Sequence, residues 1–229
     1  RSRISSFDGI DLNIEKSLMQ DFADFADGKK KLPNVPNFEK AVELYKIANN
    51  FDKRNEDGAK PIKADLEEIT SLRNLTDLNL RAADFYKNAF DLPISVSVDA
   101  DMKDTKVHVV YFGGPGLFLP DTTTYDNPAA ADLLKVLQDQ SKNLLKMAGV
   151  SEEDAKKYVE GALKFDKKLS KVLKSTEEWA DYPAMYNPMP LSEFEDKFDS
   201  FKIDNFLSNL FAQKPEKIIV TEPRFLDHV

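Results

Sequence analysis

Apolar and polar residues alternate in the middle of the chain with the period of a β-strand. Residues 94–99, ISVSVD, show this alternation, and it returns in residues 107–111, VHVVY, after a polar link. Side chains of a strand point alternately to its two faces, so the two runs predict an antiparallel hairpin at about residues 94–112. A two-stranded ribbon is not stable by itself, and we therefore expect helices to cover it.

Elsewhere apolar residues recur at helical spacing, and caps mark several helix starts. Asn37 precedes the second helix, whose expected buried face includes Leu44 and Phe51. Ser151 with Asp154 approximates a capping box. The fold class predicted is mainly α, with one small hairpin and a short strand near residues 218–220. The chain shows no repeat and no obvious linker, which favours a single domain over residues 1–229. The predicted helices cover residues 12–27, 38–51, 62–72, 76–90, 128–148, 151–174, a short stretch from 192, residues 205–211 and a last turn that starts at 221–223.

Charge and composition narrow the class of partner. The chain has 229 residues, of which 41% are hydrophobic and 31% charged, and its net charge is −8. No basic cluster interrupts the acidic background, which argues against binding to nucleic acid or to an anionic membrane. No apolar run approaches the roughly 20 residues of a membrane span. The absence of cysteine excludes disulfides and thiolate chemistry, and it favours a reducing compartment such as the cytoplasm.

The residues needed for metal or triad catalysis are missing. A catalytic zinc site takes about three protein ligands and an open position for water. The chain has two histidines, His108 and His228, and neither lies in an H-E-x-x-H motif. We expect His108 to be a structural or surface residue of the hairpin. A Ser-His-Asp triad would need one of these two histidines as its base, and no arrangement in the sequence favours it.

Three other groups of residues favour structure over ligand binding. Asp99, Asp101 and Asp104 lack the glycine that a calcium loop needs at its sixth position, so we expect solvated turn carboxylates. The glycines in residues 113–116 lack the lysine and hydroxyl of a phosphate loop, and a bend packed under helices explains them better. Residues 181–189, DYPAMYNPM, are predicted as a structural turn, with a binding loop around Tyr186 and Asn187 as the alternative.

Four segments together resemble the neprilysin family of zinc endopeptidases, in the style of bacterial endopeptidase O. The hairpin turn DADMKD leads into GPGLFLPDTTTY, which is similar to the family's D-x-K-[DN] turn and G-L-x-L-P-x-x-x-Y loop. The resemblance covers essentially the whole chain, and the order of its motifs makes it strong. The other three segments are LYKIANNFDKRNEDGAKPI (44–62), AMYNPMPLSEFE (184–195) and KIIVTEPRFLDHV (217–229).

The resemblance implies a role within a larger enzyme. Members of the family have two mainly helical lobes around a closed cavity, and one lobe carries H-E-x-x-H with a downstream glutamate ligand. This chain resembles the other lobe, which caps the cavity and admits small peptides. The parent protein would therefore be a zinc metalloendopeptidase whose zinc ligands lie outside this chain. Its partners would be oligopeptide substrates and the catalytic lobe of the same protein, and the fragment alone would be inactive.

One residue of the chain is implied to touch substrate. The opening SRISSFD (residues 2–8) is similar to the S-R-x-x-x-F-D pattern of the mammalian members, although residues 4–6 depart from them. There the arginine helps to hold the terminal carboxylate of the peptide. The resemblance thus assigns substrate binding to Arg3, whose guanidinium offers a fork of donors suited to a carboxylate.

A second class of function stays open from the sequence alone. The chain could be a free-standing helical peptide-binding or scaffold protein that shares the ancestry of the lobe and lacks catalysis. An H-E-x-x-H helix encoded downstream of Val229 would decide between the two.

Overall fold

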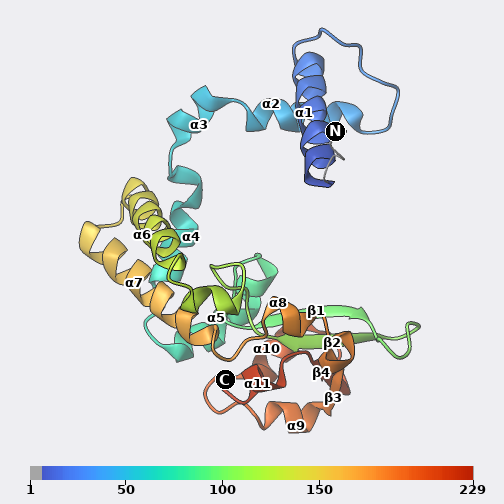
Figure 1. The fold of residues 1–229 in the computed structure, drawn as a ribbon, viewed down its shortest axis with the longest axis vertical. Coiled ribbons are helices and arrows are strands. Elements are labelled where there is room, and N and C mark those ends of the chain that lie inside the picture. The colour runs from blue at the N-terminus through green and yellow to red at the C-terminus, as the bar shows by residue number, and fades with distance from the viewer. Residues whose placement is uncertain (1–6, 229) are drawn as a thin grey trace, which may run out of the picture. The chain divides into compact units, whose positions relative to one another are not determined.

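The computed structural model describes residues 7–228, which form two compact units divided between residues 1–61 and 62–229. Figure 1 shows the ribbon coloured along the chain, and each unit is described by itself. Contacts within a structure do not measure whether two units unfold together. The prediction of a single domain over residues 1–229 therefore stays a prediction.

The first unit is a small helical region held together by aromatic rings. The ring of Phe22 stacks on Phe38 and on Tyr45 at 5.8 and 5.7 Å between centroids, and Phe25 meets Phe38 edge to face at 5.2 Å. These contacts join α1 to α2. The helices of this unit are α1 (Phe7–Ala26), α2 (Phe38–Ala48) and α3 (Phe51–Asp57), and η1 (Lys60–Ile62) follows at the boundary.

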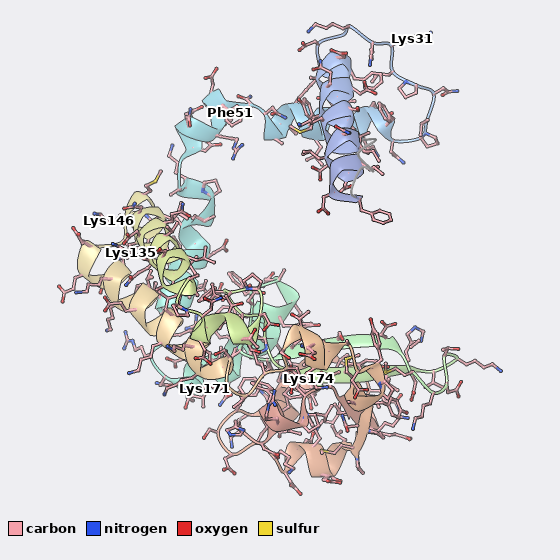
Figure 2. All side chains as sticks on the ribbon, in the orientation of Figure 1. Lys31, Phe51, Lys135, Lys146, Lys171 and Lys174 are labelled. Carbon is pink, nitrogen blue, oxygen red and sulfur yellow. The ribbon has the colours of Figure 1, made fainter. Side chains whose placement is uncertain are left out.

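The predicted second helix is two helices in the structure, and its buried face was wrong in part. The side chain of Asn50 accepts a hydrogen bond from the backbone N–H of Lys53 at 3.0 Å, so Asn50 starts a new helix instead of continuing the old one. Leu44 and Phe51, both expected inside, are 67% and 59% exposed, whereas Val42 is buried. Figure 2 shows the side chain of Phe51 at the start of α3.

The second unit contains the remaining helices. The cap predicted at Ser151 is confirmed, because its hydroxyl accepts a hydrogen bond from the backbone N–H of Asp154 at the start of α7. Helix α7 stops at Leu169, before the predicted end at 174. The fold class, mainly α, is confirmed. The helices are α4 (Lys63–Thr70), α5 (Leu75–Lys87), η2 (Thr122–Asp126), α6 (Ala130–Met147), α7 (Glu152–Leu169), α8 (Thr176–Trp179), η3 (Tyr182–Met185), α9 (Leu191–Glu195), α10 (Ile203–Leu210) and α11 (Pro223–Leu226).

The predicted hairpin is confirmed, but it belongs to a larger mixed sheet. Strands β1 (Ser95–Ala100) and β2 (His108–Gly113) pair antiparallel, with Ser95 opposite Gly113. Strand β4 (Lys217–Val220) lies parallel to β2, and β3 (Asn187–Pro190) pairs antiparallel with β4. The order is β1-β2-β4-β3. Strand β3 was predicted as a turn because its prolines cannot donate to a ladder and leave little strand signal.

One face of this sheet carries the main hydrophobic core. Phe112 of β2 is 1% exposed and lies between the rings of Phe194 and Phe225. Helices α5, α9, α10 and α11 contribute to the same cluster, which supplies the cover that a hairpin requires. The core includes Ala82, Phe85, Val96, Val110, Phe112, Phe194, Ile203, Phe206, Leu207, Ile218, Val220, Phe225 and Leu226.

Candidate functional site: a cleft on the polar face of the sheet

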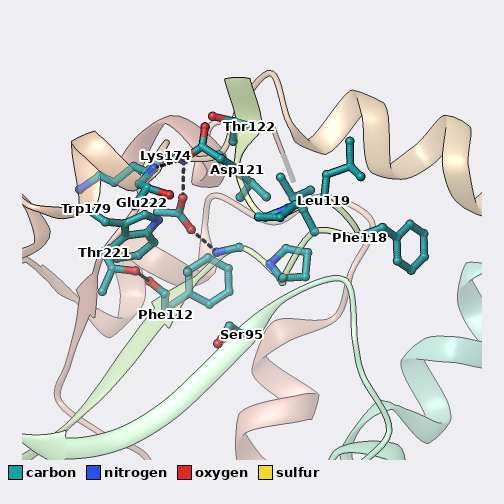
Figure 3. A pocket seen from close by; sticks show the side chains of 18 of the residues that line it. Ser95, Phe112, Phe118, Leu119, Asp121, Thr122, Lys174, Trp179, Thr221 and Glu222 are labelled. Carbon is teal, nitrogen blue, oxygen red and sulfur yellow. Dashed lines mark hydrogen bonds between the residues drawn. The ribbon is translucent and has the colours of Figure 1, made fainter. Parts of the chain in front are cut away.

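A cleft of about 600 Å³ lies within the second unit, beside the strands that the hairpin pattern predicts. Its volume is within the usual range of ligand sites, about 300–1,000 Å³. Two strands contribute the floor, the loop of residues 113–122 forms one wall, and residues 173–179 form the other. Figure 3 shows Trp179 and Lys174 on one side of this cleft and Leu119 on the other.

The floor follows from the alternation in the sequence. Ser95 and Ser97 of β1 face the cleft, and their register partners Gly113 and Tyr111 line it too. Successive residues of a strand point to opposite faces, so Val96, between the two serines, enters the core instead. The small side chains leave room above the sheet, and this room is the cleft.

Gly113 and Gly114 are required by close packing at the bend. A Cβ on Gly113 would lie 2.5 Å from Oγ1 of Thr221, and one on Gly114 would overlap Cδ2 of Leu173. Any larger residue would therefore push the two walls of the cleft apart. This confirms the interpretation of a packed backbone bend for Gly113 and Gly114, whereas a Cβ on Gly116 would meet open space.

A buried carboxylate joins the two walls. Glu222 is 3% exposed, and it accepts hydrogen bonds from the backbone N–H of Gly114 at 2.8 Å and of Lys174 at 2.7 Å (Figure 3). Hydrogen bonds to a charged group are stronger than neutral ones, so Glu222 fixes the spacing of the walls. Nothing in the sequence around Glu222 indicated this role, because its partners are 108 and 48 positions away.

Asp121 makes a second bridge at the mouth of the cleft. It accepts from Thr123, through the backbone N–H at 2.8 Å and the hydroxyl at 2.6 Å, and from the backbone N–H of Thr176 at 2.5 Å. The bonds from Thr123, followed by those from Thr176, hold the pKa of Asp121 well below its usual range. The carboxylate is therefore ionised throughout the physiological range.

The apolar wall of the cleft is held from behind by another buried carboxylate. Asp166 of α7 accepts from the backbone N–H of Phe118 at 3.1 Å and from the hydroxyl of Tyr125. Burial, reinforced by the bond to Asp166, raises the pKa of Tyr125 to about 12, so the phenol keeps its proton and donates. Tyr125, the tyrosine that matches the end of the G-L-x-L-P-x-x-x-Y pattern, therefore positions the loop of residues 113–122.

The turn carboxylates of the hairpin were predicted to be solvated, and for Asp101 this was wrong. Asp101 is 2% exposed and accepts from Lys217 at 2.8 Å, from Tyr186 at 3.3 Å and from the backbone of Lys103 at 2.9 Å. The bond from Lys217 is the main reason that its pKa falls to about 2. The spacing of the carboxylates could not reveal this burial, because Lys217 is 116 positions away. The other two carboxylates of the turn are exposed.

The residues 181–189 serve local structure. Tyr186 contacts Asp101, and the side-chain amide of Asn187 donates to the carbonyls of Ala184 and Val220, both at 2.9 Å. These bonds attach β3 to the sheet. They support the structural alternative over a binding loop, although the segment includes a strand.

Neither histidine lines the cleft. His108 is exposed on β2, and Nδ1 of His228 lies 2.8 Å from the carbonyl of Arg224. No group of three side chains able to hold a metal ion occurs within residues 7–228, so the chain's described side chains do not fit a zinc site. Arg3 lies outside the described residues.

Comparison with known proteins identifies the family. The family model described as "Peptidase family M13", in its N-terminal part, matches residues 1–229. The chain belongs to peptidase family M13. Neutral endopeptidase of Lactobacillus helveticus is 53% identical over 96% of the chain, and neutral endopeptidase of Lactococcus lactis subsp. cremoris is 34% identical over 99%. The chain spans 34% and 36% of the lengths of these M13 relatives.

Solved structures agree with this M13 assignment. The crystal structure of PepO from Lactobacillus rhamnosis matches 95% of the chain with a TM-score of 0.81 at 25% identity, and the chain covers 35% of it. A zinc metalloprotease of Mycobacterium tuberculosis, solved with an inhibitor, shares the fold with a TM-score of 0.75 at 19% identity. Among residues 7–228, no helix has the length and apolar character needed to cross a membrane.

Proposed function

We propose that this chain is the cap lobe of a zinc-dependent endopeptidase that hydrolyses small peptides in the cytoplasm. The match of the M13 model to residues 1–229 carries the proposal. It is supported by the name of the Lactobacillus helveticus relative, a neutral endopeptidase, of which the chain spans about a third. The catalytic lobe and all zinc ligands would then lie in the rest of the parent protein, and the cap would limit the size of the peptides that enter.

The test uses the full-length parent protein. Purified with zinc, it should cleave short peptides, and it should lose this activity to a chelator and regain it when zinc is restored. The 229-residue chain alone should cleave nothing under the same conditions. Chelator-sensitive cleavage by the isolated chain would contradict the proposal. A reading frame without H-E-x-x-H after Val229 would favour the scaffold alternative.

Within this proposal, Arg3 holds the free carboxylate of a bound peptide. A hydrogen bond to a charged group contributes about 1.5–3 kcal/mol. Arg3→Ala in the full-length protein should therefore lower kcat/KM roughly 10- to 150-fold on peptides that end one or two residues beyond the cut. Lysine should restore part of the activity, because it keeps the charge and loses the fork.

Amidated peptides provide the control for Arg3. They lack the charge that the guanidinium would meet, so Arg3→Ala should barely change their cleavage. Equal losses on free-acid and amidated peptides would show that Arg3 acts on folding or on closure of the lobes. No loss on either would show that Arg3 has no part in binding.

A further inference from the structure

The cleft above the sheet offers hydrogen-bond donors, and the two carboxylates that line it already accept hydrogen bonds. The carboxylates of Asp121 and Glu222 accept from the backbone of the opposite wall. Within residues 7–228, no hydrogen bond engages the hydroxyls of Ser95 and Ser97 or the indole N–H of Trp179. These groups can donate to a ligand that brings acceptors.

Lys174 adds a charged donor at the same place. Its Nζ lies 5.3 Å from the centre of the Trp179 ring and 3.4 Å from the carbonyl of Ala184, which is a long hydrogen bond. The cation is thus held over the ring with most of its donor capacity free. Trp179 is 37% exposed and presents apolar surface to the cleft, as Leu117 does from the opposite wall.

The charges of the walls exclude a strongly anionic ligand. Two carboxylates, those of Asp121 and Glu222, line the cleft, and Lys174 is the one lysine or arginine among its lining residues. A polyphosphate or a nucleic acid would meet net repulsion there. A neutral chain rich in carbonyl oxygens, with apolar side chains, meets donors and apolar surface instead.

The cleft is also pre-formed. Glu222 and Asp121 each bridge the two walls, and Gly113 and Gly114 allow the bend to pack tightly against Thr221 and Leu173. A ligand would not have to order these walls, and this saving in conformational entropy favours binding.

We propose that this cleft is a peptide-binding subsite of the cap lobe, which takes an extended, neutral peptide segment through its main-chain carbonyl oxygens. Ser95, Ser97, Lys174 and Trp179 donate to those oxygens, and apolar side chains of the peptide lie against Trp179 and Leu117. The subsite is distinct from the predicted carboxylate contact of Arg3, because it recognises the main chain and needs no free terminus. The proposal rests on the proposed function, since it assumes that peptides reach the lobe.

The fluorescence of Trp179 can be used to measure binding at this subsite. Trp179 is the one tryptophan in the sequence. We expect its fluorescence to change saturably when the 229-residue chain is titrated with short synthetic apolar peptides that are acetylated and amidated, so that Arg3 has no carboxylate to meet. A nucleotide and a neutral oligosaccharide are titrated in parallel. Saturable binding of either of these without binding of the peptide would overturn the proposal.

A matched pair of variants places the binding in the cleft. Ser97→Phe fills the floor, and Val98→Phe makes a similar change on the opposite face of the same strand, outside the cleft. Both positions are exposed, and aromatic residues suit strands. Peptide affinity should fall at least tenfold in Ser97→Phe and stay unchanged in Val98→Phe. An unchanged affinity in Ser97→Phe would contradict the proposal.

Removal of single donors gives a second, milder test. Lys174→Met and Trp179→Phe each keep an apolar body and lose a donor, and each should weaken binding about two- to tenfold by calorimetry. These variants decide the question if Ser97→Phe proves unfolded by circular dichroism. If both variants bind the peptide as tightly as the unaltered chain, the assignment of Lys174 and Trp179 as donors is wrong.

The full-length protein separates this inference from the proposed function. There, Ser97→Phe should raise KM and leave kcat nearly unchanged, because the subsite binds substrate and transition state alike. A parent that cleaves peptides with the same KM in both forms would contradict the subsite alone. A parent without peptidase activity would contradict the proposed function, whereas binding to the chain would still stand.

Discussion

The two units of the chain bury very different amounts of apolar surface, although both contain amphipathic helices. The second unit has an extended core in which Phe112, Phe194, Ile218 and Val220 are at most 1% exposed. In the described part of the first unit, Val42 is the one buried hydrophobic residue, and Phe7 is 92% exposed. Similar helical patterns therefore do not guarantee similar cores.

The sheet accounts for this difference. In the second unit, β1, β2 and β4 bring segments more than 100 residues apart into register, and several helices then close over one face. The first unit has aromatic contacts between α1 and α2 and no strand among its described residues. Ordering the backbone costs about 1–2 kcal/mol of conformational entropy per residue, and the small core of the first unit offsets little of that cost. We expect the second unit to dominate the cooperative unfolding of the isolated chain.

The largest expected loss of stability comes from replacing a phenylalanine by alanine, and each unit has an aromatic cluster in which to compare this change. Phe112→Ala should lower the free energy of unfolding by about 3–5 kcal/mol, because it leaves a cavity in the core. Phe38→Ala, in the cluster of the first unit, should leave the transition reported by Trp179 unchanged within about 0.5 kcal/mol. Urea denaturation followed by Trp179 fluorescence measures both. Equal losses would show that the units unfold as one.

A smaller effect is expected at Glu222, which holds the walls of the cleft. Glu222→Ala leaves the partly buried backbone N–H groups of Gly114 and Lys174 without their acceptor, and it should destabilise the second unit by roughly 2–4 kcal/mol. Glu222→Gln keeps an acceptor oxygen and should lose about half as much. The same urea transition gives both values. An unchanged free energy of unfolding in Glu222→Ala would mean that water replaces the carboxylate and that the walls are less tightly joined.

Lowering the pH should destabilise the second unit through Asp101. Its folded pKa of about 2, set mainly by Lys217, lies below the usual value of about 3.9. The ionised form is therefore favoured by folding, and the stabilisation is present above about pH 4 and disappears as the pH falls toward 2. Asp101→Asn should flatten the stability of the second unit over this range. Asp99→Asn, at an exposed position of the same hairpin, is the control and should keep the slope.

The smallest effect concerns matched helix caps. Ser151→Ala removes the cap of α7 in the second unit and should cost about 1 kcal/mol in the Trp179 transition. Asn50→Ala removes the cap of α3 in the first unit and should change that transition much less. Hydrogen exchange should instead show faster exchange of α3 amides in Asn50→Ala. Protection of α3 equal to that of α7 in the unaltered chain would contradict the comparison.

The sequence alone determined the local elements and the family. Alternation in residues 94–99 predicted β1, capping residues predicted the start of α7, and the order of four motifs indicated peptidase family M13. These signals succeed because strand period, caps and turn glycines depend on neighbours a few positions apart. The bend at Gly113 and Gly114 was anticipated for the same reason, whereas its packing partners Thr221 and Leu173 are distant in the sequence.

Only the tertiary structure decided how distant segments combine. The parallel pairing of β2 with β4, the burial of Asp101 beside Lys217 and the bridge from Glu222 to Gly114 each join residues more than 100 positions apart. The cleft likewise needs four segments, and its Trp179 and Lys174 carry no motif. Single-sequence patterns record which face of an element is apolar, but not which partner covers it. That choice depends on packing and hydrogen bonding across the whole unit.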